Sequence, residues 1–327
     1  MPSSTPPADS ASLYRTVRLI RRFEERAIEL VRAGVIAGGI HPYIGEEAIA
    51  AGVCAALRKD DLITSTHRGH GHVLAKGADP ARMLAELAGR ASGLNGGRGG
   101  SMHAAQVSAG IYGANAIVGA SAAIAAGAAW SHRRAGHDRV VGTFFGDGAV
   151  NQGVLLEALN LASLHRLPVL FICENNQFAT SMRVEDTTAG TITGRAEAFG
   201  IPAATIDGMD AEVVFEAASR AVNRARAGHG PTFLECSTYR FDAHHTWEHA
   251  VRPRYRTAEE IAAGSARDPV TIQAARVPAA ARSAIDDEIE ELLDEARRFV
   301  DASPEPDPSG ALDYLYADGL RGRAGVH

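Results

Sequence analysis

The sequence predicts an α/β protein with a mostly parallel β-sheet and helices on both faces of that sheet. The clearest sign lies mid-chain, where apolar strand patterns at 140–145 and 168–173 flank a helical pattern at 151–165. A second pair of apolar runs, at 203–206 and 232–236, flanks another helical pattern. Alternating strands and helices are typical of a parallel sheet, because parallel strands need a crossover connection that is usually a helix.

The N-terminal elements follow from spacing and composition. Apolar residues recur every three to four positions over 11–33, which predicts an amphipathic helix. The Ala-rich segment 46–57 predicts a second helix, and the run 62–66 predicts a short strand. That strand leads into HRGHGH at 67–72, which is expected to be extended. A further helix is expected after the Asp-Pro pair at 79–80, because proline is favoured at the first helical position.

The remaining segments continue the alternation and then leave it. Five glycines within 93–100 predict a loop, and the small-residue segment 116–130 predicts a helix packed tightly against a sheet or another subunit. The amphipathic segment 212–227 predicts the helix between the last two strands. A polar loop rich in His and Arg is expected from 239 to 256, and a long acidic helix at 279–300.

Composition excludes several classes of protein. The 33 basic and 39 acidic residues give a formal net charge of -6, so the chain lacks the basic footprint of a nucleic-acid binder. No stretch approaches the roughly 18 to 20 uninterrupted apolar residues of a membrane span, and no secretory signal is read at the start. The three cysteines lack Cys-x-x-Cys spacing, as expected for reduced thiols in the cytoplasm. We expect a cytoplasmic protein without a nucleic-acid or membrane partner.

The domain organisation is expected to be simple. Residues 1–10 are polar and Pro-rich and are expected to form a flexible N-terminal tail. Because no internal repeat or separate linker is visible, residues 11–327 are expected to form a single domain. This domain would include a C-terminal helical region from about 257.

Two short motifs carry the chemistry. The first is Gly-Asp-Gly at 146–148, directly after one predicted strand, with Asp147 in its centre. The second is Asn-Asn at 175–176, which closes the next predicted strand with Asn176, and 26 residues lie between the two motifs. Carboxylate and amide oxygens are ligands that Mg²⁺ accepts when it also holds phosphate groups. The glycines let backbone approach a phosphate closely. Because ligands of parallel sheets bind at the strands' carboxyl ends, the spacing predicts a site for a metal and a diphosphate.

The motifs together carry a family resemblance. The segments 63–77, 99–103 (GGSMH), 146–153 and 174–176 (ENN) resemble the alpha subunit of thiamine diphosphate-dependent E1 components. This family includes 2-oxo acid dehydrogenases and acetoin dehydrogenases, and the segment 67–72 is most similar to the acetoin type. The similarity extends in order from about residue 13 to residue 256. The resemblance implies a thiamine diphosphate-binding fold with a C-terminal helical extension.

The resemblance also implies which residues hold the cofactors. Mg²⁺ would be bound by the side chains of Asp147 and Asn176 and by the backbone oxygen of Phe178. The remaining predicted positions would contact the thiamine diphosphate itself. They are Gly146, Gly148 and Ala149 in the first motif, His67, Arg68 and Arg240 as diphosphate partners, and Ala116 and Val118 at the aminopyrimidine.

Two histidines are the predicted catalytic residues. His41 precedes a Gly-Glu-Glu sequence at 45–47, where the family has Gly-Gln-Glu, and His244 follows the Thr-Tyr-Arg sequence at 238–240. Imidazole suits proton transfer near neutral pH, because its unperturbed pKa is about 6.5.

Zinc binding is the alternative use of the histidines. Two groups of histidines are candidates, one at positions 67, 70 and 72 and the other at positions 244, 245 and 249. No paired Cys accompanies either cluster, and alternating residues of an extended segment point to opposite faces. The sequence therefore disfavours zinc.

The resemblance implies an oxidoreductase and its partners. With thiamine diphosphate and Mg²⁺, such an enzyme cleaves the C–C bond next to a carbonyl, either in a 2-oxo acid such as pyruvate or in acetoin. It then passes the acyl group to a lipoyl-bearing E2. In the family the cofactor lies between alpha and beta chains, so an E1 beta subunit in an alpha2beta2 heterotetramer is implied. At 327 residues the chain is too short to hold both halves.

One segment departs from the family pattern. After His244 the family continues with a short Ser/Thr-containing or acidic loop ending in Asp-Pro. This chain instead has HTWEHAVRP at 245–253, which is longer and differently charged. The usual regulatory serine is absent, so phosphorylation control at this loop is not expected.

Three other functions stay open from the sequence. One is a carboligase that transfers an acyl or ketol unit on the same two-chain scaffold without a lipoyl partner. Another is a nucleotide-binding Rossmann protein, since GDGAVN at 146–151 superficially resembles a glycine fingerprint, although Asn151 replaces its third glycine. The third is a catalytically silent assembly subunit.

Overall fold

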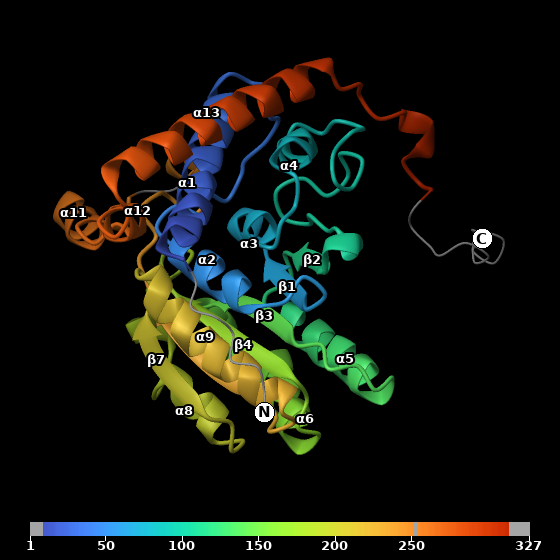
Figure 1. Cartoon of the computed structure of the whole chain (residues 1–327), viewed down its shortest axis with the longest axis vertical. Coiled ribbons are helices and arrows are strands. Elements are labelled where there is room, and N and C mark those ends of the chain that lie inside the picture. The colour runs from blue at the N-terminus through green and yellow to red at the C-terminus, as the bar shows by residue number, and fades with distance from the viewer. Residues whose placement is uncertain (1–8, 252–253, 314–327) are drawn as a thin grey trace.

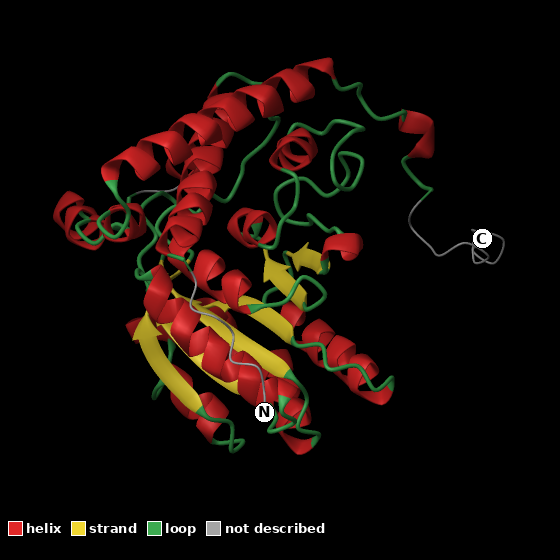
Figure 2. Ribbon diagram, in the orientation of Figure 1, coloured by secondary structure: helices red, strands yellow, loops and turns green. Residues whose placement is uncertain are grey.

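A parallel sheet forms the centre of the molecule (Figure 1, Figure 2). The computed structural model describes residues 9–251 and 254–313, so the predicted tail lies almost entirely outside the described residues. The sheet has six strands in the order β2-β1-β3-β4-β8-β7, and every neighbouring pair is parallel. They are β1 (Leu62–Thr66), β2 (Ile111–Asn115), β3 (Val141–Gly146), β4 (Val169–Asn175), β7 (Ala203–Asp207) and β8 (Thr232–Ser237). The predicted α/β class with a mostly parallel sheet is confirmed.

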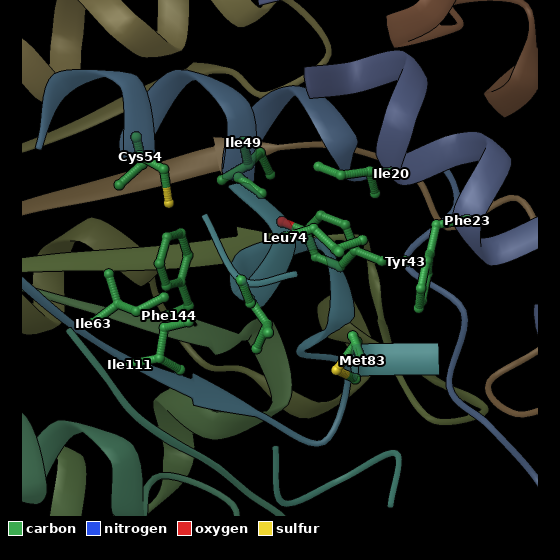
Figure 3. Close-up of a cluster of buried hydrophobic side chains, with 14 of the residues drawn as sticks. Ile20, Phe23, Tyr43, Ile49, Cys54, Ile63, Leu74, Met83, Ile111 and Phe144 are labelled. Atoms are coloured by element: carbon green, nitrogen blue, oxygen red, sulfur yellow. The ribbon is translucent and has the colours of Figure 1, made fainter. Parts of the chain in front are cut away.

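Helices cover both faces of the sheet, as predicted. On one face the strands pack against α2 (Glu47–Ala56) and α9 (Ala211–Arg226). On the other they pack against α5 (Ala120–Arg134), α6 (Gly153–Leu164) and α8 (Ile192–Glu197). Successive strand residues point to opposite faces, so Phe144 belongs to the first core and Phe145 to the second. Figure 3 shows Phe144 among the buried side chains of the first core.

Two long helices form an outer layer over the first core. The helices α1 (Ser10–Arg32) and α13 (Ala279–Ala302) lie against each other (Figure 1). A buried stripe on α13 repeats every three to four residues, and ion pairs such as Arg15–Glu288 and Arg26–Asp294 line the seam. Exposed ion pairs contribute at most about 1 kcal/mol each, so the apolar stripe holds the layer.

Shorter elements complete the described chain. They are α3 (His70–Ala75), α4 (Pro80–Leu87), α7 (Val184–Thr187), α10 (Glu248–Val251), α11 (Ala258–Ser265), α12 (Pro269–Ala274), the antiparallel pair β5 (Phe178–Ala179) and β6 (Met182–Arg183), and the 3-10 turns η1 (Val107–Ala109), η2 (Asp147–Asn151) and η3 (Pro308–Gly310). None of the described helices is both long enough and apolar enough to cross a membrane.

The structure corrects the predicted course of the chain in two places. Residues 67–72 are not extended throughout, because α3 begins at His70 and buries its glycine Gly71 against the ring of Tyr43. The predicted helix at 116–130 begins only at Ala120, because Gly119 adopts a φ of 85° that is incompatible with a helical turn. The strand β2 was not predicted, since its sequence IYGAN contains only one long aliphatic side chain.

The glycine loop at 93–100 folds around one buried carboxylate. Glu86 of α4 is fully buried, and each of its oxygens accepts two backbone N–H groups of the loop at 2.6 to 3.1 Å. The donors are Asn95 and Gly97 to Oε2, and Gly99 and Gly100 to Oε1. A single side chain therefore satisfies four backbone donors, and this fixes the course of the loop.

We expect the Glu86→Ala substitution to lower the free energy of unfolding by about 3 kcal/mol, because each buried donor left without a partner costs roughly 1–3 kcal/mol. Urea denaturation measures this change. Glu157→Ala, on an exposed position of α6, is the control and should shift stability by less than about 0.5 kcal/mol. Equal free energies of unfolding for the two variants would show that water accepts the four hydrogen bonds as well as the Glu86 carboxylate does.

Candidate active site

A cavity of about 250 Å³ lies at the carboxyl ends of β1, β3 and β4. The residues predicted from the motifs gather here, and all but His41 and Ala116 line the cavity. The lining members are His67, Arg68, Val118, Gly146, Asp147, Gly148, Ala149, Asn176, Phe178, Arg240 and His244. Ala116 stands between two lining residues, and the ring of His41 lies 5.0 Å and 5.1 Å from the rings of His67 and His244.

Asp147 offers an unsatisfied oxygen to this cavity. It starts the turn η2 directly after β3, and its side chain is almost wholly buried. Its Oδ1 accepts the N–H of Gly148 at 2.7 Å, whereas its Oδ2 is buried without a hydrogen-bond partner among the described residues. Burial raises the pKa of this carboxyl to about 6. A buried carboxylate oxygen without a partner is costly, and a divalent cation would satisfy it.

Asn176 is held in one orientation beside Asp147. Its Nδ2 donates to Glu46 Oε1 at 2.6 Å, and its Oδ1 accepts the N–H of Phe178 at 3.1 Å. The amide nitrogen is thus committed to Glu46, which leaves the carbonyl oxygen as the group available to a cation. The metal ligands predicted from the sequence therefore have the donor chemistry that Mg²⁺ requires.

The second glycine of the Gly-Asp-Gly motif has a packing reason. Gln177 has a φ of 73°, which is uncommon for a residue with a side chain, and it turns the chain after Asn176. This turn brings Ala179 against Gly148, where an added Cβ would lie 2.8 Å from the Cβ of Ala179. Only glycine at position 148 lets the two motif segments approach this closely.

Two buried guanidinium groups give the cavity a positive wall. Arg68 is 3% exposed and Arg240 is fully buried. Arg68 donates to the carbonyl oxygen of Pro42 at 2.7 Å, and Arg240 donates to the carbonyl oxygens of Asp242 and Thr180 at 3.2 and 3.0 Å. Burial and the charge of Arg68 lower the pKa of Arg240 to about 10. Two like charges in one buried cavity fit a multiply charged anion such as a diphosphate.

The histidines at the cavity are neutral. Burial, followed by the charge of Arg68, lowers the pKa of His41 to about 2 and that of His67 to about 3. The same two causes lower the pKa of His244 further. These pKa values lie far below the unperturbed value of about 6.5, on which the predicted role in proton transfer was based. An anion bound between the guanidinium groups would raise these pKa values, because it offsets the positive charge.

The hydrogen bonds of His244 define its tautomer. Its Nδ1 lies 3.2 Å from a terminal nitrogen of Arg68 and 3.4 Å from one of Arg240. Because guanidinium groups only donate, Nδ1 accepts and the proton of the neutral ring is on Nε2. His244 therefore presents an N–H donor on its remaining ring nitrogen.

The histidines of 67–72 take separate partners. His67 faces the cavity, whereas His70 bonds with Glu24 at 3.0 Å and with Ser101 at 2.9 Å. His72 bonds with Glu174 at 2.9 Å and with Ser65 at 2.7 Å. The three rings diverge because α3 is helical, not because an extended segment alternates. In the other cluster, the side chain of His249 lies outside the described residues.

Sequence reasoning missed two acidic residues at the site. Glu46 and Glu174 line the cavity and are 1% and 2% exposed. Burial raises the pKa of Glu46 to about 8. A signal was present in the Gly-Glu-Glu sequence, where the family has glutamine at the first acidic position. For Glu174 the signal was its position directly before the Asn-Asn pair.

The titration of Asp147 predicts a pH-dependent metal affinity. Burial raises the pKa to about 6, so the metal-free chain keeps this carboxyl protonated below that pH. Mg²⁺ binding must then release the proton, and its affinity should fall by about tenfold per pH unit below pH 6 and level off above it. Calorimetry with thiamine diphosphate, corrected for Mg²⁺ binding to the free cofactor, measures this. A flat profile would show that Asp147 is not a ligand.

Comparison with known proteins places the chain in a family. The sequence profile of the family described as Dehydrogenase E1 component matches residues 15–309. The chain is 42% identical to the alpha subunit of acetoin:2,6-dichlorophenolindophenol oxidoreductase of Cupriavidus necator over 325 residues, covering 96% of this chain and 97% of the relative. It is 42% identical to the pyruvate dehydrogenase E1 component subunit alpha of Zymomonas mobilis over 319 residues, covering 95% and 88%.

A solved structure shares the fold. A transketolase mutant from Pichia stipitis superposes with a TM-score of 0.55 at 18% sequence identity. The match covers 90% of this chain and 46% of the transketolase, so the chain spans about half of that protein. The resemblance drawn from the motifs is confirmed, and the Rossmann alternative is wrong. The chain belongs to the dehydrogenase E1 component family of thiamine diphosphate-dependent oxidoreductases, in which its relatives are alpha subunits.

Proposed function

We propose that this chain is the alpha subunit of a cytoplasmic E1 enzyme that binds Mg²⁺ and the diphosphate of thiamine diphosphate. Together with a beta subunit it cleaves the C–C bond next to a carbonyl, either in a 2-oxo acid such as pyruvate or in acetoin. The acyl group passes to a lipoyl-bearing E2. The observation that carries the proposal is the pairing of the unsatisfied Asp147 oxygen with two buried guanidinium groups in one cavity.

The proposed cofactor contacts follow from the donor groups present. Asp147, Asn176 and the backbone oxygen of Phe178 would hold Mg²⁺. Arg68 and Arg240 would hold the diphosphate. The further contacts are His67, Gly146 and the backbone of Gly148 and Ala149 toward the diphosphate, and the backbone of Ala116 and Val118 toward the aminopyrimidine. When bound, the cofactor supplies the electron sink for cleavage of the bond.

The protein's own contribution is orientation and proton control. His244 holds its proton on Nε2, because Arg68 occupies Nδ1, and it can donate a hydrogen bond to a substrate oxygen. His41 lies in edge contact with that ring, and its own Nδ1 is buried without a hydrogen-bond partner among the described residues. His244 therefore offers a neutral hydrogen-bond donor to the cavity, and His41 packs behind it.

The open side of the cavity supports a two-chain site. Ile117 and Val118 line the cavity and are 70% and 48% exposed, and Ile124 on α5 is 45% exposed. Apolar side chains exposed at the edge of a binding site are typical of a protein interface. We infer that a beta subunit covers this wall and completes the aminopyrimidine half, in an alpha2beta2 heterotetramer.

Co-expression with the candidate beta subunit from a neighbouring gene tests the function. The complex should bind thiamine diphosphate in a Mg²⁺-dependent way, and it should turn over pyruvate, a longer 2-oxo acid or acetoin with an artificial electron acceptor. Transfer to a lipoyl domain distinguishes a dehydrogenase from a carboligase, which would instead join the fragment to an aldehyde. Absence of Mg²⁺-dependent cofactor binding by the complex would refute the proposal.

Two substitutions separate the proposed roles. Asp147→Ala should weaken cofactor binding by at least about 100-fold, because it removes a charged metal ligand, while the far-ultraviolet circular dichroism stays unchanged. His244→Ala should retain cofactor affinity within about threefold and lower kcat by at least about 100-fold, as expected for loss of a preorganised hydrogen-bond donor to the substrate. Calorimetry and steady-state kinetics measure both. Equal loss of cofactor affinity in both variants would contradict the separate roles assigned to Asp147 and His244.

A further inference from the structure

The segment after His244, which departs from the family pattern, contacts the backbone of His244 and the two residues directly before His41. On one side, Thr246 and Ile40 form two hydrogen bonds. The Thr246 N–H donates to the Ile40 oxygen at 3.0 Å, and the Ile40 N–H donates to Thr246 Oγ1 at 3.2 Å. Ile40 is the residue directly before His41. The segment is thus bonded to the chain that carries the first histidine.

The ring of Trp247 packs against the same stretch of chain, at Gly39. A Cβ added at Gly39 would lie 2.8 Å from Cδ1 of this ring, so the indole rests directly on the glycine. Thr246 and Trp247 therefore meet two consecutive residues, Gly39 and Ile40, that lead into His41.

On the other side, Glu248 binds the backbone of His244. The carboxylate is fully buried, and its Oε2 accepts the His244 N–H at 2.5 Å. The same oxygen accepts the hydroxyl of Tyr255 at 3.2 Å, and that hydroxyl accepts from Arg240 at 2.5 Å. Arg68 donates to the backbone oxygen of His244 at 3.2 Å. Both polar backbone atoms of His244 are thereby held.

A buried carboxylate in this place needs a reason. Its second oxygen, Oε1, is buried without a hydrogen-bond partner among the described residues, so Glu248 is costly for stability alone. Only the other oxygen is bonded, to the His244 N–H and the Tyr255 hydroxyl. The burial of this acid is explained if the position of the His244 backbone matters for function. Because Glu248 lies four residues after His244, the contact closes a tight turn that sets the direction of the imidazole.

We propose that residues 245–248 act as a positioning segment that sets the two catalytic histidines relative to each other, with Glu248 holding His244 and Thr246 holding the chain before His41. The inference rests on the proposed function of the two histidines. The positioning segment holds the ring centres of His41 and His244 5.1 Å apart. A displacement of about 1 Å in such a pair can cost on the order of 100-fold in rate, so the segment acts on turnover.

Cofactor binding should depend little on this segment. Arg240 keeps its bonds to the backbone oxygens of Asp242 and Thr180 when Glu248 is removed. Arg68 should keep its bond to Pro42, and Asp147 should keep its bond to the Gly148 N–H. The positioning role therefore predicts a change in kcat that is separate from any change in cofactor affinity.

The test compares Glu248→Ala, Glu248→Gln and Thr246→Val in the complex with the beta subunit, on the substrate that the wild type turns over. We expect Glu248→Ala to lower kcat by at least about tenfold, with KM and the Kd of thiamine diphosphate changed by less than about threefold. Glu248→Gln should stay within about threefold of the wild type, because an amide oxygen accepts the same two hydrogen bonds. Thr246→Val, which conserves the side-chain shape, should lower kcat by about threefold.

Hydrogen exchange of residues 240–251 in the cofactor-free complex gives a second readout. Glu248→Ala should raise exchange there, and Glu197→Ala, which removes an exposed carboxylate on α8, should leave both exchange and kcat unchanged. A kcat of Glu248→Ala equal to the wild type would overturn the proposal, as would a Glu248→Gln variant as slow as Glu248→Ala. If the wild type has no turnover, the proposed function fails, and unchanged exchange then rejects the positioning role separately.

Discussion

The burial of two like charges at one edge of the sheet is the constraint on which the rest of the site depends. Arg68 and Arg240 are withdrawn from water, and the surrounding chain compensates with the Glu46 carboxylate, 3.8 Å from Arg68, and with backbone carbonyl oxygens from Pro42, Thr180 and Asp242. Supplying these acceptors requires three separate loops to meet at the carboxyl ends of the strands. A diphosphate bound as proposed would relieve the repulsion between the two guanidinium groups.

A buried polar network ties this edge to the helical layer. Glu174, at the end of β4, accepts from the hydroxyl of Tyr43 and bonds with His72 at 2.9 Å, and His72 bonds in turn with Ser65 of β1 at 2.7 Å. Buried polar groups that are satisfied by one another allow few alternative arrangements. The network therefore fixes α3 and the chain around Tyr43 against the sheet, and with them the nearby segment that carries His41.

The relatives of this chain are alpha subunits, and its exposed apolar side chains fit the beta subunit proposed above. The side chains proposed to hold a metal and a diphosphate come from strand ends that are supported by both cores, whereas the apolar side chains at 117, 118 and 124 are 70%, 48% and 45% exposed. This asymmetry is expected if the cofactor binds between two subunits, as proposed. The loop after His244 is held by its own side chains, because Glu248 accepts from the His244 N–H and Thr246 accepts from the Ile40 N–H.

The sequence by itself determined the parallel α/β fold, the two motifs and the family, because hydrophobic periodicity and the spacing of Asp147 and Asn176 are local properties. Through the resemblance it also predicted roles for Arg68, Arg240 and His244, which the structure brings together at one cavity. Only the tertiary structure decided that the histidines are neutral, that Glu46 orients Asn176, that α3 interrupts the extended segment and that Glu248 holds His244. These features depend on burial and on contacts between residues far apart in the chain, which no local pattern records.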